Sequence, residues 1–110
     1  MADLAGPALS PHLTKEIYMK ASDIPQGQGV TGEIGGRHVA VYNSGDQLTV
    51  LDNVCTHMGC QTEWNAFDQT WDCPCHGSRY KKDGTVMRGP AMGPLPSLGF
   101  RVEDDGIVIE

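Results

Sequence analysis

Four cysteines and two of the four histidines are gathered in one stretch of this 110-residue chain. The stretch holds two motifs, Cys-Thr-His-Met-Gly-Cys starting at Cys55 and Cys-Pro-Cys-His-Gly-Ser starting at Cys73, with twelve residues between them. Thiolate and imidazole groups together are ligands of zinc, copper and iron–sulfur centres. Two Cys/His loops at this spacing therefore predict a metal centre with sulfur and nitrogen ligands.

A Cys2His2 zinc site is one possible centre, but three features of the motifs argue against it. Only one residue separates Cys55 from His57, whereas structural zinc sites usually place two to four residues between paired ligands. The four cysteines are two more than such a site needs. Gly59 and Gly77 follow the histidines, as expected of loops that wrap a bulky cluster. The pattern favours an iron–sulfur cluster, and a structural zinc module, which would be colourless, is the alternative.

The two motifs together resemble the signature of Rieske [2Fe–2S] proteins, whose cluster is held by two cysteines and two histidines. The ligands that this resemblance implies are Cys55 and Cys73 on one iron, and His57 and His76 on the other. The resemblance also implies a disulfide between Cys60 and Cys75, which would tie the two loops together. We therefore expect one [2Fe–2S] cluster as the cofactor.

The resemblance further assigns two hydroxyl groups that tune the cluster: Ser78 to a bridging sulfide and Tyr80 to a cysteine sulfur. Two thiolates leave the oxidised cluster formally neutral, so it accepts an electron more readily than a four-thiolate cluster. Rieske centres span about −150 to +300 mV, and hydrogen-bond donors raise the potential further. We expect the upper part of this range, with proton transfer coupled to electron transfer at His57 and His76.

Two further segments are expected to cover the cluster. Met58 stands at the tip of the first loop, where cytochrome bc-type relatives usually have leucine, and it keeps the position apolar. Gly89 and Pro90 begin a sequence similar to the family's Gly-Pro-Ala-Pro loop, although Met92 replaces its last proline. The proline loop, residues 89–96, is expected to lie on a third side of the cluster.

The resemblance implies an electron carrier, or the redox domain of a larger oxidoreductase system, and not an enzyme by itself. A quinol or cytochrome system is one expected redox partner. The stretch from Glu63 to Cys73 is also similar to the Rieske domain at the C-terminus of some FAD-dependent oxidoreductases, which makes a flavoprotein the alternative partner. A ferredoxin component of an oxygenase is less favoured, because that branch of the family lacks the extra cysteine pair.

The rest of the chain indicates an all-β fold. Fourteen glycines and seven prolines favour short strands joined by tight turns, and no segment has convincing helical periodicity. Strands are expected over 14–20, 30–34, 37–43, 47–52, 98–102 and 107–109, with a hairpin turn at Gly35 and Gly36. We expect a flexible tail over 1–13 and a single Rieske domain over 14–110. Antiparallel sheets would form its base domain, and the two loops its cluster-binding lobe, about 55–80.

Three aromatic residues lie between the motifs, Trp64, Phe67 and Trp71, and we expect all three in a small core beneath the loops. His38 alternates with inward-facing valines on an expected strand. It is therefore interpreted as a residue of the strand surface and not as a ligand.

The formal net charge of −6 argues against nucleic-acid binding, which requires a basic surface. Four basic residues nevertheless follow the second motif: Arg79, Lys81, Lys82 and Arg88. They are either a solvated hairpin or a positive rim that attracts an acidic partner.

The sequence has neither a run of about 20 apolar residues nor a signal peptide over 1–13, so we expect no membrane span. These features suggest a cytoplasmic protein or a soluble fragment. The disulfide would then have to persist in a reducing compartment, as one of low potential can.

Overall fold

The computed structural model describes residues 19–55 and 59–110. These residues form three antiparallel sheets and one short 3-10 helix, η2 (Ala21–Asp23), which confirms the all-β prediction. The strand expected over 14–20 lies largely outside the described residues, and Lys20 at its end forms an isolated bridge with Gly106. Within the described ranges, no helix is long and apolar enough to cross a membrane.

The first sheet is the centre of the molecule and consists of β1 (Gln28–Ile34), β2 (Arg37–Asn43) and β3 (Leu48–Asp52), in that order. The turn between β1 and β2 lies at Gly35 and Gly36, as predicted, where φ is 59° and 82°. Glycine adopts positive φ without the steric cost that a side chain would bring, so this pair fixes the hairpin register.

The central strand β2 is buried on both faces and so separates two hydrophobic cores. On one face, Val39 and Val41 pack with Val50 and Ile107. On the other face, Ala40 and Tyr42 pack with a second group, Leu51, Cys55, Trp71, Cys73, Tyr80, Ala91 and Leu95. This second core contains both motif cysteines that begin the loops. The first sheet therefore supports the two Cys/His motifs directly.

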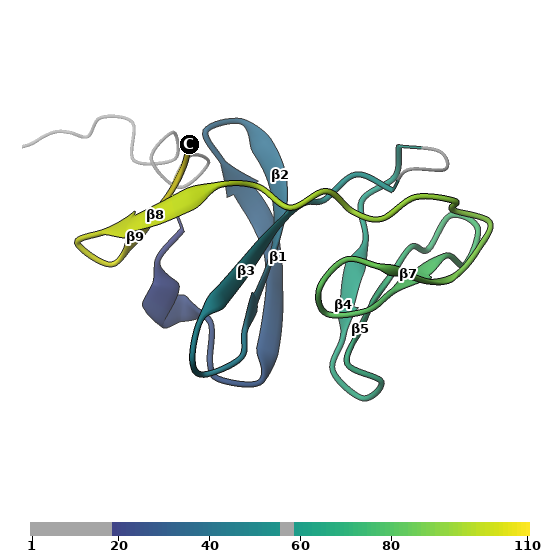
Figure 1. The fold of residues 1–110 in the computed structure, drawn as a ribbon, viewed down its shortest axis with the longest axis horizontal. Helices are drawn as coiled ribbons and strands as arrows, with labels where there is room; N and C mark the ends of the chain where they lie inside the picture. The colour runs from purple at the N-terminus through teal and green to yellow at the C-terminus, as the bar shows by residue number, and fades with distance from the viewer. Residues whose placement is uncertain (1–18, 56–58) are drawn as a thin grey trace, which may run out of the picture.

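The other two sheets lie at opposite ends of the first sheet (Figure 1). The hairpin of β8 (Phe100–Glu103) and β9 (Gly106–Ile109) covers one end, close to where both strands were predicted. At the other end, four short strands form a lobe in the order β4 (Glu63–Asn65), β5 (Thr70–Asp72), β6 (Arg79–Tyr80) and β7 (Val86–Arg88). The proline loop, residues 89–96, runs from β7 back towards the first sheet and contains no strand, because its three prolines lack a backbone N–H donor (Figure 1).

The aromatic residues of the lobe only partly follow the prediction. Trp71 is fully buried and packs against half-buried Trp64, with ring centroids 4.7 Å apart. Both indoles approach the backbone of Gly29 so closely that a Cβ there would lie 2.6 Å from a Trp64 ring carbon. Any side chain at position 29 would therefore separate β1 from the lobe.

The prediction that Phe67 joins this core is wrong, because its side chain is 94% exposed. Phe67 lies in the turn between β4 and β5, which is closed by a hydrogen bond from the Asp68 backbone N–H to Asn65 Oδ1 (2.9 Å). The turn continues through Gln69 at a φ of 59°. This local geometry, and not the apolar character of the residue, decides where the ring lies.

Candidate metal centre

The two motif loops share one backbone hydrogen-bond pattern. In the first, the N–H of Cys55 donates to the carbonyl of Cys60, and the N–H of Gly59 donates back to the Cys55 carbonyl at 2.8 Å. In the second, Cys73 N–H donates to the Ser78 carbonyl at 2.8 Å, and Gly77 N–H donates to the Cys73 carbonyl at 3.0 Å. Both glycines have positive φ, 77° and 83°. The glycines that follow the histidines are thus required by the turn that closes each loop.

The cysteine that opens each loop is buried. Cys55 and Cys73 are each 2% exposed and stand outside the disulfide. Burial raises the pKa of the Cys73 thiol, and the neighbouring Cys55 thiol raises it further. Two adjacent buried sulfurs fit a cluster iron well, because a bound metal ion favours the thiolates that burial alone disfavours.

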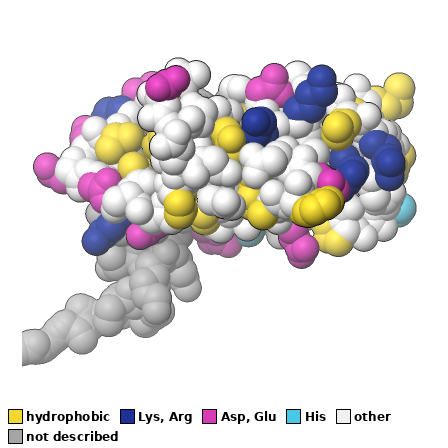
Figure 2. Space-filling view, turned by 90° about the horizontal axis from the view of Figure 1, so that it is seen from below, with side chains coloured by type: hydrophobic (Ala, Val, Ile, Leu, Met, Phe, Trp, Pro, Cys, Tyr) yellow, Lys and Arg dark blue, Asp and Glu magenta, His cyan; other side chains and the backbone are white. Residues whose placement is uncertain are grey.

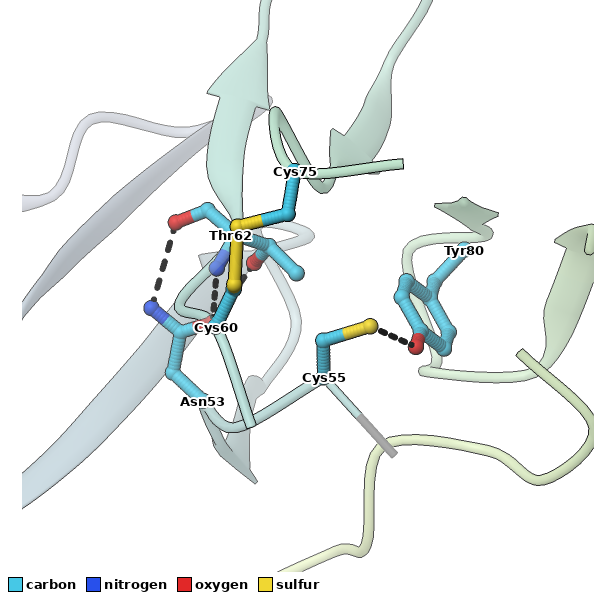
Figure 3. The surroundings of a disulfide bond; sticks show 6 residues. All are labelled: Asn53, Cys55, Cys60, Thr62, Cys75 and Tyr80. Carbon is cyan, nitrogen blue, oxygen red and sulfur yellow. Dashed lines mark hydrogen bonds between the residues drawn. A yellow bond between two sulfur atoms is a disulfide. The ribbon is translucent and has the colours of Figure 1, made fainter. Parts of the chain in front are cut away.

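A disulfide between Cys60 and Cys75 joins the end of the first loop to the middle of the second (Figure 3). Its Cα atoms are 6.6 Å apart, and the Sγ atoms of Cys60, Cys73 and Cys75 all lie within 4.8 Å of one another. The bond holds the two loops side by side, so the Cys73 sulfur is fixed close to the first loop.

Tyr80 contacts the first loop from the lobe sheet. Its side chain is fully buried on β6, and its hydroxyl donates a hydrogen bond to Cys55 Sγ at 3.1 Å (Figure 3). Cross-strand pairing with buried Trp71 fixes the position of the ring. A donor held at this distance from a sulfur lowers the energy of negative charge on that sulfur.

Ser78 connects the second loop to the proline loop. Its Oγ atom is buried and accepts a hydrogen bond from the Ala91 backbone N–H at 3.0 Å. Because an accepting hydroxyl retains its own proton, Ser78 can also donate to a cluster sulfide. Gly89 and Pro90 are exposed just before this contact, while Ala91 is buried in the core that holds Cys55 and Cys73.

The structure brings Cys55, Cys60, Cys73, Cys75, Ser78 and Tyr80 together. His76 lies exposed in the second loop, and His57 and Met58 lie outside the described residues. His38 stands apart on β2, where its Nδ1 is 3.4 Å from Glu33 Oε2.

Sequence reasoning missed a buried side-chain pair that clamps the base of the first loop. Asn53 and Thr62 are each 2% exposed, and Asn53 Oδ1 accepts hydrogen bonds from the Thr62 backbone N–H (2.9 Å) and hydroxyl (2.6 Å). The Asn53 amide donates to the Thr62 carbonyl at 3.2 Å (Figure 3). The available signal was that both residues stand two positions outside the first motif.

Sequence reasoning also missed the partners of Arg79. Its guanidinium donates two hydrogen bonds to Asp72, at 3.0 and 3.1 Å, and forms an ion pair with Asp68. The hydrogen bond to Asp72 makes the largest contribution to raising the pKa of Arg79, and the contact with Asp68 raises it further. Burial acts to raise the pKa of Asp72, but hydrogen bonds from Arg79, Asn65 and Thr70 outweigh it, and that pKa is lowered. Arg79 is therefore a structural cation of the lobe.

Comparison with known proteins decides the family. The sequence pattern of the Rieske [2Fe-2S] domain matches residues 15–99. The chain belongs to the Rieske [2Fe–2S] family. One Rieske [2Fe–2S] cluster is accordingly its cofactor. The buried cysteines, the disulfide and the hydroxyl donors described above fit this group.

Similar proteins include iron-sulfur subunits of cytochrome b6-f complexes and a much longer chain. The cytochrome b6-f complex iron-sulfur subunit of Chlorobaculum thiosulfatiphilum is 40% identical over 90 residues, which is 82% of this chain and 50% of that protein. YhfW of Bacillus subtilis, a protein named for a Rieske 2Fe-2S centre, is 46% identical over 77 residues, or 69% of this chain and 15% of that protein. This chain thus spans half or less of these relatives.

Solved structures share the Rieske fold. The plasma membrane Rieske protein PetC3 from Synechocystis PCC 6803 is 33% identical, with a TM-score of 0.63 over 74% of this chain and 85% of that one. A hyperthermophilic respiratory Complex III has a chain that is 25% identical, with a TM-score of 0.68 over 94% of this chain and 81% of that one. Both confirm the predicted fold class.

Proposed function

We propose that this Rieske protein is a high-potential, proton-coupled one-electron carrier. The proposed ligands are Cys55 and Cys73 on one iron and His57 and His76 on the other. With these ligands the cluster supplies reversible one-electron chemistry, at potentials of about −150 to +300 mV for the family. The observation that carries the proposal is the buried hydrogen bond from the Tyr80 hydroxyl to Cys55 Sγ.

The hydrogen-bond donors near the cluster support a reduction potential in the upper part of the Rieske range. Tyr80 and Ser78 are both fully buried, so water does not compete with their hydroxyl groups. Reduction adds negative charge, and a fixed donor stabilises the reduced state more than the oxidised one. The two hydroxyl groups therefore raise the reduction potential.

Proton coupling is assigned to the imidazoles. His76 is exposed in its loop, so the nitrogen that does not bind iron can exchange protons with solvent or with a partner. Added negative charge at the centre raises the pKa of a nearby imidazole. We propose that His76 and His57 take up protons on reduction and release them on oxidation.

The proposed redox partner is a quinol or cytochrome system. The cytochrome b6-f relatives and the Complex III chain support this assignment. On its own, the chain carries electrons and does not catalyse a reaction. We propose one Rieske domain over 14–110; residues 1–13, for which the sequence predicts a tail, lie outside the described residues. Its cluster-binding lobe would cover about 55–80, with the proline loop over 89–96.

A second candidate is the redox domain, or separate partner, of a flavin-dependent oxidoreductase. The sequence between the motifs resembles such domains, and the Bacillus subtilis relative extends far beyond the matched 15%. An oxygenase ferredoxin has less support, because the ferredoxin structures similar to this chain are 20–24% identical and share the fold alone.

A redox titration followed by EPR tests the proposal. The dithionite-reduced protein should give a Rieske-type EPR signal, and its midpoint should be positive and fall with rising pH. A zinc module would give no signal. A midpoint well below zero that stays constant between about pH 6 and 9 would rule out the high-potential assignment in favour of a ferredoxin.

A further inference from the structure

The charge of the chain is unevenly distributed between its two ends. Residues 55–96 carry four Lys or Arg and four Asp or Glu. The other residues carry four Lys or Arg and ten Asp or Glu. The formal charge of −6 therefore belongs entirely to the part of the chain outside the lobe and the proline loop. Figure 2 shows Lys and Arg side chains gathered on one face towards the lobe end, with more Asp and Glu towards the other end.

Five exposed residues of the β6–β7 hairpin and the proline loop, three basic and two apolar, are here called the basic–methionine patch: Lys81, Lys82, Met87, Arg88 and Met92. Met92 is 97% exposed and Met87 is 55% exposed. The three cations are also exposed. Asp83 lies in the same turn, so the patch with its acidic neighbour keeps a net positive charge.

Part of the patch adjoins the second loop of the metal centre. Arg88 is the cross-strand partner of Arg79, which lies three residues after His76. Ala91, next to Met92, donates its backbone N–H to Ser78 Oγ in the second loop. The turn that holds Lys81 and Lys82 is bound to the proline loop by a hydrogen bond from Leu95 N–H to the Gly84 carbonyl (2.9 Å). A partner seated on Arg88 and Met92 would thus lie beside the second loop. Lys82, whose Nζ is 5.3 Å from the centroid of the Tyr42 ring, extends the patch towards the first sheet.

From this arrangement we propose that the basic–methionine patch docks an acidic electron-transfer protein. Carboxylates of the partner would face Lys81, Lys82 and Arg88, and apolar partner surface would cover Met87 and Met92. Flexible, polarisable methionines suit a contact that must form and dissociate quickly. Because the opposite end holds the negative charge, an acidic partner is repelled there and directed towards the lobe.

This inference rests on the proposed electron-carrier function, and a matched pair of oxidants tests it. Native cytochrome c is basic, and succinylated cytochrome c is its acidic counterpart. Reduced holoprotein is mixed with each in a stopped-flow instrument at increasing salt. We expect the acidic oxidant to react faster at low salt and to slow as salt rises, although the net charge of −6 alone predicts the reverse.

Two triple variants localise the effect. Lys81→Gln/Lys82→Gln/Arg88→Gln should slow the acidic oxidant by about tenfold at low salt and abolish its preference. Lys20→Gln/Arg37→Gln/Arg101→Gln removes the same charge outside the patch and should leave the preference intact. Met87→Ser/Met92→Ser should lower the rate without changing its salt dependence.

The outcomes separate the two claims. If the basic oxidant is faster and both triple variants behave alike, overall charge governs encounter and the docking proposal is wrong. The proposed carrier function would still stand in that case, provided the reduced EPR signal and the pH-dependent midpoint are present. If that signal is absent, both proposals fail.

Discussion

The Tyr80 hydroxyl donates a hydrogen bond to Cys55 Sγ at 3.1 Å, and both groups are buried in the core that β2 shares with the lobe. The tyrosine stands on the sheet of the lobe, and the cysteine begins the first loop. This single contact therefore joins the scaffold to the metal centre, and it also brings a proton donor to a ligand sulfur.

Tyr80→Phe should lower the reduction midpoint and leave the cluster in place. A net hydrogen bond is worth about 0.5–1.5 kcal/mol, which corresponds to a shift of roughly 20–65 mV for one electron. EPR-monitored titration measures the shift. Tyr42→Phe is the matched control, because the Tyr42 hydroxyl donates to Gln69 Oε1 at 3.5 Å and, within the described residues, to no motif residue. Equal midpoints for Tyr80→Phe and the wild type would show that this contact does not tune the cluster.

Ser78→Ala should change both the midpoint and the stability. It removes a donor near the cluster, which lowers the midpoint, and it leaves the buried Ala91 N–H without its acceptor. A buried group left unsatisfied costs about 1–3 kcal/mol. Thermal unfolding of the holoprotein measures the second effect, and Ser97→Ala on the exposed surface is the control. A lower midpoint with unchanged stability would mean that Ser78 does not anchor the proline loop.

Removing the disulfide by Cys60→Ala/Cys75→Ala should weaken cluster retention. A cross-link that closes a loop of 15 residues contributes about 3 kcal/mol by restricting the unfolded chain. We expect faster loss of visible absorbance on heating and a lower unfolding temperature. Unchanged bleaching kinetics would contradict the idea that the bond holds the two loops together.

Asp72→Asn should lower stability at neutral pH and have less effect in acid. Hydrogen bonds from Arg79, Asn65 and Thr70 hold the pKa of Asp72 in the folded protein below its ordinary value, so its contribution to stability is complete at neutral pH. It is lost as pH falls through the folded pKa. Unfolding temperatures of wild type and variant should therefore converge below about pH 4, whereas Asp46→Asn in an exposed turn should show little difference. A difference that persists at low pH would argue against the Arg79–Asp72 ion pair.

The sequence was most informative where structure is local. Each Cys/His motif is recognised from a few adjacent residues. The hairpin turn at Gly35 and Gly36 is likewise predicted from these two residues, because glycine adopts positive φ without steric cost. Alternating valines identified β2, although they did not show that both of its faces are buried.

The remainder depends on contacts between distant parts of the chain. The ion pair of Arg79 with Asp72 requires β5 and β6 to be adjacent, which no local pattern records. Phe67 was misplaced because apolar character suggested burial, whereas the hydrogen bonds of the turn set its direction. The Asn53–Thr62 clamp was missed because neither residue type alone indicates a buried pair.

The midpoint potential measured as a function of pH tests the central claim most directly. The Tyr80 and Ser78 donors and the two imidazoles predict a positive midpoint near neutral pH. They also predict a decrease with rising pH, approaching about 59 mV per unit where one proton accompanies each electron. A midpoint below zero with no slope between about pH 6 and 9 would contradict a high-potential, proton-coupled carrier.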